Sequence, residues 1–522
     1  MEKMIKLNRA ENAKKSILWS CTNKMILLVF PFVLRMVFFR KLSADSLGLD
    51  SLFSSILQVL NLSELGFSSA VVYAMYSPIA HGDSDTVCAI VRFLKKVYFM
   101  IGILILSAGL LLMPWIKYFI KGSDAYPANI YILFFIYLVN TSASYMLFAY
   151  RETLLTAYQR NDVRSIIYTL TKTMTYLFQI VIIITTKNYY YYAACLVAGT
   201  VANNILIKIS TEKLFPEVHG QGNIDKILRT DILLKAKGLM LDKICSVSRN
   251  SLDSICISGF LGLAMNAKYN NYYMILAAVV SLLSMIGHSI IGGVGNSVVT
   301  ETVEKNFGDM KKINFLYMWI SGWFTTCLFC LYQPFISLAY GAGMKLSKWS
   351  VCLFCIYFYV LEMGTVRGIY SDACGLWWEN RYRTAAEIIS NIVLNVVLGK
   401  LWGINGIIAA TLISLIIINF AWGSHIIFIH YFKGISIKEY FIPHMKYAMV
   451  TGFVAAITNY VCGMVPYKGG LGIAVMLAVC ALVPNLLYIV LFRQFEIYRA
   501  AMEWIGAVLH VDRCWFMKWL GK

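Results

Sequence analysis

The stretch Ile17–Phe39, ILWSCTNKMILLVFPFVLRMVFF, decides the fold class of this chain. It is long enough to cross the ~30 Å hydrocarbon core of a bilayer as one helix, yet it contains Lys24 and Arg35. At 100° per residue these two side chains point to nearly the same side of a helix. A cation that faces lipid near the bilayer centre costs at least ~2.5 kcal/mol. We therefore expect this side to face a wet, protein-lined cavity, and cations there indicate an anionic passenger.

The composition of the whole chain agrees with a membrane protein. Of its 522 residues, 59% are hydrophobic and only 14% are charged, and the mean hydropathy is +0.66. Soluble domains contain about 25% charged residues. The apolar runs are about 20 residues long and do not alternate with polar residues, which favours helices over a β-barrel. The sequence thus predicts an all-α polytopic membrane protein with about 14 transmembrane helices.

The distribution of basic residues predicts the topology. We place spans at 17–39, 47–75, 94–116, 128–149, 165–186, 189–210, 239–260, 268–295, 313–336, 349–371, 385–402, 404–430, 445–465 and 470–492. An even number puts both termini on one side. With that side cytoplasmic, inner segments hold about three times as many Lys and Arg as outer loops, as the positive-inside rule requires. The net charge of +19 is explained by this bias and by anionic head groups rather than by nucleic acid.

The spans group into two halves. We expect a basic cytoplasmic N-terminus at 1–16, a six-helix lobe at 17–210, a cytoplasmic linker at 211–238 and a second six-helix lobe at 239–430. Two extra helices follow at 431–492, and an amphipathic cytoplasmic tail occupies 493–522. A weak repeat with an offset of 226 residues aligns Asn23-Lys24 with Arg249-Asn250. Halves with six spans each share one orientation, which predicts a pseudo-twofold axis along the membrane normal.

The seventh predicted span carries a second group of charges. Asp242, Arg249 and Asp253 fall on one side of a helical wheel. In one interpretation Arg249 and Asp253 form an i, i+4 ion pair that only neutralises itself. In the other, Asp253 orients Arg249 toward a substrate phosphate, which a planar guanidinium can grip with two hydrogen bonds. The cations of the first span favour the second interpretation.

Other polar residues within the spans are further candidates. Glu64 is either a partner of Lys24 or Arg35 or a proton-coupling carboxylate. Lys172 and Arg367 either face the cavity, pair with another charge or snorkel to the membrane surface. His288 is a packing residue or a proton relay.

Enzymatic and metal-binding motifs are missing from the sequence. There is no nucleotide-binding loop, serine nucleophile elbow or metalloprotease helix. The pairs Cys327/Cys330 and Cys352/Cys355 have metal-type spacing but lie in apolar runs without nearby His or carboxylate ligands. We expect these cysteines to pack as small hydrophobes, and we expect no cofactor, no metal and no catalysis.

Several stretches, in their order and spacing, resemble the Wzx-type polysaccharide flippases of the multidrug/oligosaccharidyl-lipid/polysaccharide exporter superfamily. They are Leu34–Arg40, Leu47–Phe53, Leu62–Phe67, Tyr73–Ala80, Asn250–Asp253, Tyr269–Tyr272, Asp372–Leu376, Arg381–Arg383 and Gly403–Gly406. The resemblance implies a V-shaped pair of lobes in the bacterial inner membrane. It implies that a polyprenyl-diphosphate-linked oligosaccharide moves to the outer leaflet by alternating access, for surface polysaccharide biosynthesis such as O-antigen or exopolysaccharide.

The resemblance also implies which residues bind and which partners act. It favours Lys24, Arg35 and Arg249 as contacts of the anionic head group, with Asn250, Asp253 and Glu64 beside them. A polysaccharide polymerase and glycosyltransferases are candidate partner enzymes, and membrane lipids surround the protein. One alternative is a drug or cation exporter of the same superfamily, which needs an anionic cavity. Another is a membrane-bound polymerase or ligase, which needs a large outer loop that the sequence lacks.

Overall fold

The computed structural model describes residues 26–61, 67–122, 129–466 and 469–508. Within these ranges, nothing is described of the side chains of residues 69, 235–246, 248, 250, 507 and 508. The predicted site residues Lys24 and Glu64 therefore lie outside the described residues, as do the side chains of Asp242 and Asn250.

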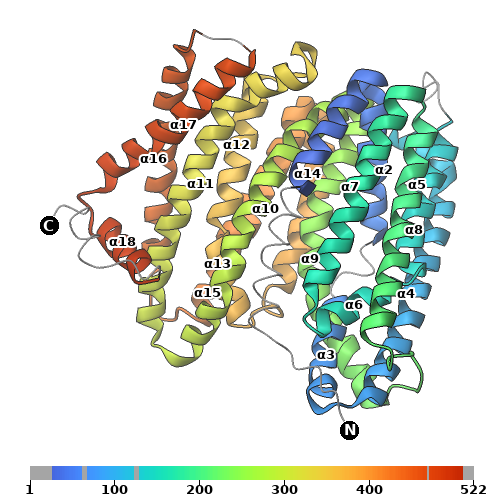
Figure 1. The fold of residues 1–522 in the computed structure, drawn as a ribbon. Coiled ribbons are helices and arrows are strands. Elements are labelled where there is room, and N and C mark those ends of the chain that lie inside the picture. The colour runs from blue at the N-terminus through green and yellow to red at the C-terminus, as the bar shows by residue number, and fades with distance from the viewer. Residues whose placement is uncertain (1–25, 62–66, 123–128, 467–468, 509–522) are drawn as a thin grey trace. The chain divides into compact units, whose positions relative to one another are not determined.

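The described part of the chain is helical and contains no strand (Figure 1). A first helix covers 26–41. Up to the polar linker the elements are α2 (Ala44–Leu60), α3 (Phe67–His81), α4 (Ser84–Leu112), the 3-10 helix η2 (Met113–Phe119), α5 (Ile130–Met146), α6 (Tyr150–Ala157), α7 (Asn161–Thr186) and α8 (Tyr189–Leu214). After it come α9 (Lys226–Leu261), α10 (Leu263–Thr300), α11 (Val303–Tyr340), the 3-10 turn η4 (Ala342–Met344), α12 (Lys348–Met363), α13 (Thr365–Ala373), α14 (Arg381–Ser414), the π-helix η5 (Leu415–Trp422), α15 (Gly423–His430), α16 (Lys438–Gly463), α17 (Gly469–Phe492) and α18 (Glu496–Val508).

Many of these helices can cross a bilayer. Among the described residues, eight helices are long and apolar enough to do so, or nine if the bent pair α5 and α6 forms one span. Several predicted spans do not appear as one long helix; 47–75, for example, is occupied by α2 and α3. The prediction of an all-α polytopic membrane protein is confirmed, and the count of 14 spans stays a prediction.

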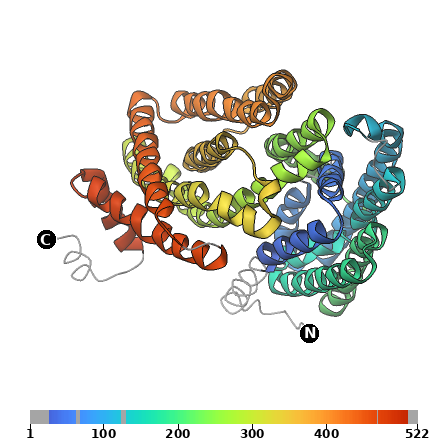
Figure 2. The ribbon, with the colours of Figure 1, turned by 90° about the horizontal axis from the view of Figure 1, so that it is seen from above.

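The chain divides into two compact units, Met1–Ala267 and Lys268–Lys522. In the first unit α4 packs on α5, α7 on α8, and α9 on both α2 and α3. In the second, α11 packs against α12, α16, α17 and α18, and Figure 2 shows these helices from above. The division falls within α10, after α9, and not at the predicted linker 211–238. The packing of α9 on α2 and α3 explains why this helix joins the first unit, and the predicted lobe boundaries stay a proposal.

A tight helical hairpin connects the eleventh and twelfth predicted spans. Both lie in α14, which is broken at Gly403, where the backbone angles are φ 58° and ψ −134°. A positive φ of this kind is strained for any residue with a Cβ atom. Three residues later, a Cβ atom added to Gly406 would lie 1.8 Å from the carbonyl oxygen of Leu398. Two glycines thus allow the chain to reverse at the break that separates 385–402 from 404–430.

The last described helix packs on the second unit. Tyr498 and Ala501 of α18 are buried in an apolar cluster with Phe315 and Phe492, and the charged residues of α18 are exposed. This places the amphipathic part of the predicted tail against α11 and α17. The remainder of the predicted tail, 509–522, lies outside the described residues.

The hairpin yields a prediction about stability. Substituting Gly406→Ala should lower the free energy of unfolding by roughly 1–3 kcal/mol, since the new methyl group has to push the Leu398 backbone away. The matched control is Gly452→Ala in α16, where an added Cβ meets no atom within 4 Å. Thermal unfolding of both purified variants in detergent checks this expectation. Equal melting temperatures for the two variants would contradict the close approach.

Candidate functional site

Arg35 lies in a hydrogen-bonded group inside the first unit. Its Nη2 atom donates to Ser51 Oγ at 3.1 Å, and Ser51 Oγ donates to the Leu47 carbonyl at 3.0 Å. The neighbouring Asp50 is close enough to Arg35 to interact with it electrostatically, and Asp50 accepts a short hydrogen bond from the Tyr137 hydroxyl. Sequence reasoning missed this carboxylate, although Asp50 stands as an acidic residue within the predicted span 47–75.

Arg249 and Asp253 lie one turn apart on α9, in the same unit. Arg249 is half-buried and Asp253 is buried. Close by, Ser251 Oγ donates to Gln58 Oε1 of α2 at 3.0 Å, so this part of α9 is fixed to α2. The arrangement is compatible with both interpretations of the pair, and the assignment of Arg249 to substrate stays a prediction.

Lys172 lines a polar cavity of about 770 Å³ within the first unit. Its ammonium nitrogen lies 5.6 Å from the centre of the Tyr168 ring. The other lining residues are mostly tyrosines, hydroxyl and amide side chains and one charged pair; they include Tyr73, Tyr76, Tyr98, Tyr145, Glu152, Thr156, Arg164, Thr200, Asn203 and Asn204. These residues come from α3, α4, α5, α6, α7 and α8.

The chemistry of this cavity suits a polar, partly anionic molecule. Arg164 Nε donates a short hydrogen bond to Glu152 Oε1, which neutralises both charges. Lys172 belongs to none of the ion pairs found in the described part of the chain, and its ammonium group lies over the face of an aromatic ring instead. Tyrosine rings and amides can pack on and hydrogen-bond sugar rings, and an ammonium group attracts phosphate. The cavity can therefore hold part of a sugar phosphate.

Arg367 is buried in a separate network in the second unit. Its Nη2 atom donates to Asn419 Oδ1 at 3.0 Å, and Asn419 Nδ2 donates to Glu387 Oε2 at 2.9 Å. Glu387 also accepts from Arg383 Nη1 at 3.0 Å. Asn419 lies in the π-helix η5, a distortion that often accompanies function. Of these residues, sequence reasoning singled out only Arg367 and the Arg381–Arg383 motif; the i, i+4 spacing of Arg383 and Glu387 was the available signal.

The structure also shows the surroundings of His288 and of Cys330, which the sequence analysis considered as possible functional residues. His288 is exposed on α10 and is not among the residues that line the polar cavity of Lys172. Cys330, Cys462 and Cys480 are buried together, with their sulfur atoms within 4.8 Å of one another, a grouping that sequence spacing did not reveal. A metal would require thiolates, whereas Leu331, Met476 and Val479 make these surroundings apolar. Packing therefore accounts for this cluster.

Comparisons with known proteins place the chain in a family. The family model described as polysaccharide biosynthesis protein matches residues 13–291, which is more than half of the chain. The chain belongs to this family. The resemblance to polysaccharide flippases of the multidrug/oligosaccharidyl-lipid/polysaccharide exporter (MOP) superfamily is confirmed.

Solved structures with the same fold include two transporters. The lipid II flippase MurJ, in an inward closed conformation, has a TM-score of 0.65 and 14% identity, over 92% of this chain and 98% of that one. An inward-facing multidrug resistance MATE family transporter of the MOP superfamily has a TM-score of 0.61 and 12% identity, over 78% of this chain and 97% of that one. At such identities the match shows the fold alone. No curated protein matches the sequence.

The buried network of the second unit predicts a large effect on stability. The substitution Glu387→Gln should cost about 3–5 kcal/mol, because it leaves the buried Arg383 guanidinium without its carboxylate. The control is Glu301→Gln, which removes an exposed i, i+4 pair with Lys305 and should cost at most about 1 kcal/mol. Thermal unfolding in detergent measures both. Similar losses for the two variants would rule out a compensating role for Glu387.

Proposed function

We propose that the protein is a flippase that moves a polyprenyl-diphosphate-linked oligosaccharide from the cytoplasmic to the outer leaflet of the bacterial inner membrane. The observation that supports this most is the polar cavity with Lys172, which lies among apolar helices in a family of polysaccharide biosynthesis proteins. Sugars and diphosphate cannot cross hydrocarbon unaided, because moving polar and charged groups out of water costs many kcal/mol. A cavity of hydroxyl, amide and cationic groups replaces that water.

In this proposal different residues hold different parts of the substrate. The diphosphate binds between the cations Lys24, Arg35 and Arg249, with Asp253 orienting Arg249 and Ser51 and Asp50 fixing Arg35. The oligosaccharide extends toward the polar cavity of Lys172. The polyprenyl chain stays in the bilayer. Rocking of the two six-helix lobes then exposes the head group to each side of the membrane in turn, as in other transporters with repeated halves.

A drug or cation exporter of the same superfamily is the alternative. It would require carboxylates that are available to a cationic passenger. In the first unit Asp50 accepts from Tyr137 and lies beside Arg35, while Glu152 is paired with Arg164. Both carboxylates are thus neutralised by neighbouring groups, and Lys172 makes the cavity cationic. This balance favours an anionic substrate.

The first functional prediction concerns Lys172. In a strain that lacks this gene, the variant Lys172→Gln should restore surface polysaccharide at least about tenfold less well than the native protein, because hydrogen bonds from the charged ammonium group to the oligosaccharide are worth about 1.5 kcal/mol or more. Complete lipid-linked repeat units should accumulate, measured by mass spectrometry of membrane extracts. The control Lys348→Gln changes an exposed lysine at the start of α12. Full export by Lys172→Gln would exclude Lys172 from substrate binding.

The second functional prediction separates the two interpretations of Arg249 and Asp253. Arg249→Glu should abolish export while the protein still inserts into the membrane. The charge-swapped double variant Arg249→Asp with Asp253→Arg keeps an ion pair but moves the cation by one turn. If Arg249 binds phosphate, the double variant stays inactive. Recovery of export by the swap would assign the pair a structural role alone.

A further inference from the structure

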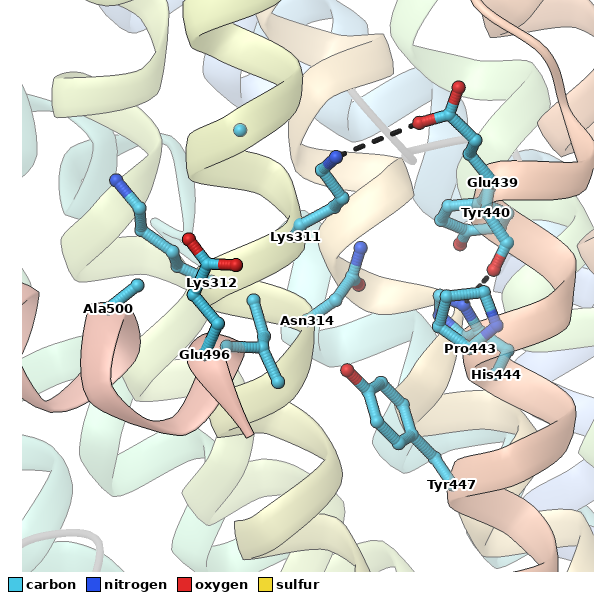
Figure 3. Close-up of a pocket in the computed structure, with 12 residues that line it drawn as sticks. Lys311, Lys312, Asn314, Glu439, Tyr440, Pro443, His444, Tyr447, Glu496 and Ala500 are labelled. Atoms are coloured by element: carbon cyan, nitrogen blue, oxygen red, sulfur yellow. Dashed lines mark hydrogen bonds and ion pairs between the residues drawn. The ribbon is translucent and has the colours of Figure 1, made fainter. Parts of the chain in front are cut away.

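A pocket of about 450 Å³ lies within the second unit, where α11, α16 and α18 meet (Figure 3). It shares no lining residue with the polar cavity of the first unit. Its rim carries Lys311 and Lys312 from α11, Glu439 from α16 and Glu496 from α18. Its inner wall is formed by aromatic and aliphatic side chains, among them Pro443, Tyr447, Ile497 and Ala500. A charged rim above an apolar wall suits an amphiphile.

The wall of this pocket contains buried polar atoms that form no hydrogen bond. They are Asn314 Oδ1 and His444 Nε2, and both residues are more than nine-tenths buried. His444 Nδ1 lies 2.7 Å from the Tyr440 carbonyl oxygen, which can only accept, so Nδ1 carries the hydrogen and Nε2 presents a lone pair. Asn314 Oδ1 is also an acceptor. Buried acceptors without partners are unfavourable, and they point to a ligand that donates hydrogen bonds.

The rim holds charges of both signs. Lys312 forms an ion pair with Asp309 at 2.9 Å, while Lys311 and Glu439 are 3.7 Å apart, farther than a hydrogen bond. Glu496 is exposed and takes part in none of the ion pairs found in the described residues. In Figure 3 its carboxylate lies on the Lys312 side of the pocket, and His444 lies on the opposite wall. Such a rim can bind an anionic and a cationic group of one molecule.

An apolar cavity adjoins this pocket. Its volume is about 700 Å³, and it is lined by α11, α12, η5 and α16 with residues such as Phe329, Met445 and Met449. His444 lines both spaces, so the pocket and the apolar cavity meet at this side chain. A molecule with its polar end in the pocket can therefore place an apolar chain near the apolar cavity. In the proposed topology α11 and α16 begin at the cytoplasmic surface, which is the level of lipid head groups.

We propose that this pocket binds a glycerophospholipid whose head group carries a phosphate and a primary ammonium group. The phosphate lies at Lys311 and Lys312. The ammonium group donates to Glu496 and to the acceptor Asn314. The site is distinct from the proposed substrate path, and it would attach α18 to α11 and α16 through a lipid.

Native mass spectrometry of the delipidated full-length protein tests this proposal. The probes are dioleoyl lipids with ethanolamine, choline or glycerol head groups, together with free O-phosphoethanolamine. The ethanolamine lipid should bind about tenfold more tightly than the other two lipids, since choline cannot donate and glycerol carries no cation. Free O-phosphoethanolamine should bind more weakly than the lipid, because it lacks the acyl chains.

Matched variants locate the site. Glu496→Gln, at an exposed helix start, should weaken binding of the ethanolamine lipid about tenfold and leave binding of the choline lipid unchanged. Glu301→Gln, which changes another exposed glutamate of the same unit, should bind as the native protein does. Equal affinities for all three lipids, preference for the glycerol lipid, or native binding by Glu496→Gln would each overturn the proposal. Equal binding of O-phosphoethanolamine would overturn its lipid part.

Discussion

The constraint that shapes this molecule is the cost of placing ionised side chains inside an apolar helical bundle. Isolated charges are very unfavourable there, so they persist only with partners of opposite charge or with several hydrogen bonds. The structure satisfies this requirement within each unit. Arg35 is held by Ser51 beside Asp50 in the first unit, and Arg383 is held by Glu387 in the second. A cation that a buried carboxylate holds at 3.0 Å, as Glu387 holds Arg383, is suited to fixing helices in place.

The fold class could be predicted because it depends on features that are local in the sequence. Long apolar runs without alternation allow only helices, and the break at Gly403 was placed correctly between two predicted spans because a glycine there permits a positive φ. The association of α9 with α2 and α3 could not be predicted. It depends on side-chain packing between segments about 200 residues apart, and no short-range pattern encodes such a contact. The π-helix η5 was missed for a similar reason, since its Asn419 is held by Arg367 and Glu387.

The sequence could name single candidate residues of the site, but it could not show which of them lie together. The apolar run 165–186 places Lys172 in a predicted span, yet it cannot show that Glu152 and Arg164 pair with each other in the same cavity. Asp50 was overlooked because its partners, Arg35 and Tyr137, are on other helices. The three clustered cysteines come from α11, α16 and α17, so their spacing along the chain carried no signal.

Whether a buried cation already has a carboxylate partner affects how well it can bind an anionic substrate. A passenger with two phosphates has to displace water without first breaking a strong internal ion pair, because the energy of that pair would be subtracted from binding. Arg383 and Arg164 are therefore poor candidates for direct contact, since carboxylates already hold them. Lys172 faces a ring instead, an interaction that is weaker than an ion pair and that a polar group of the substrate can replace. A cation without a carboxylate partner is one that an anionic substrate can recruit, and Lys172, which lines the polar cavity, forms no ion pair among the described residues.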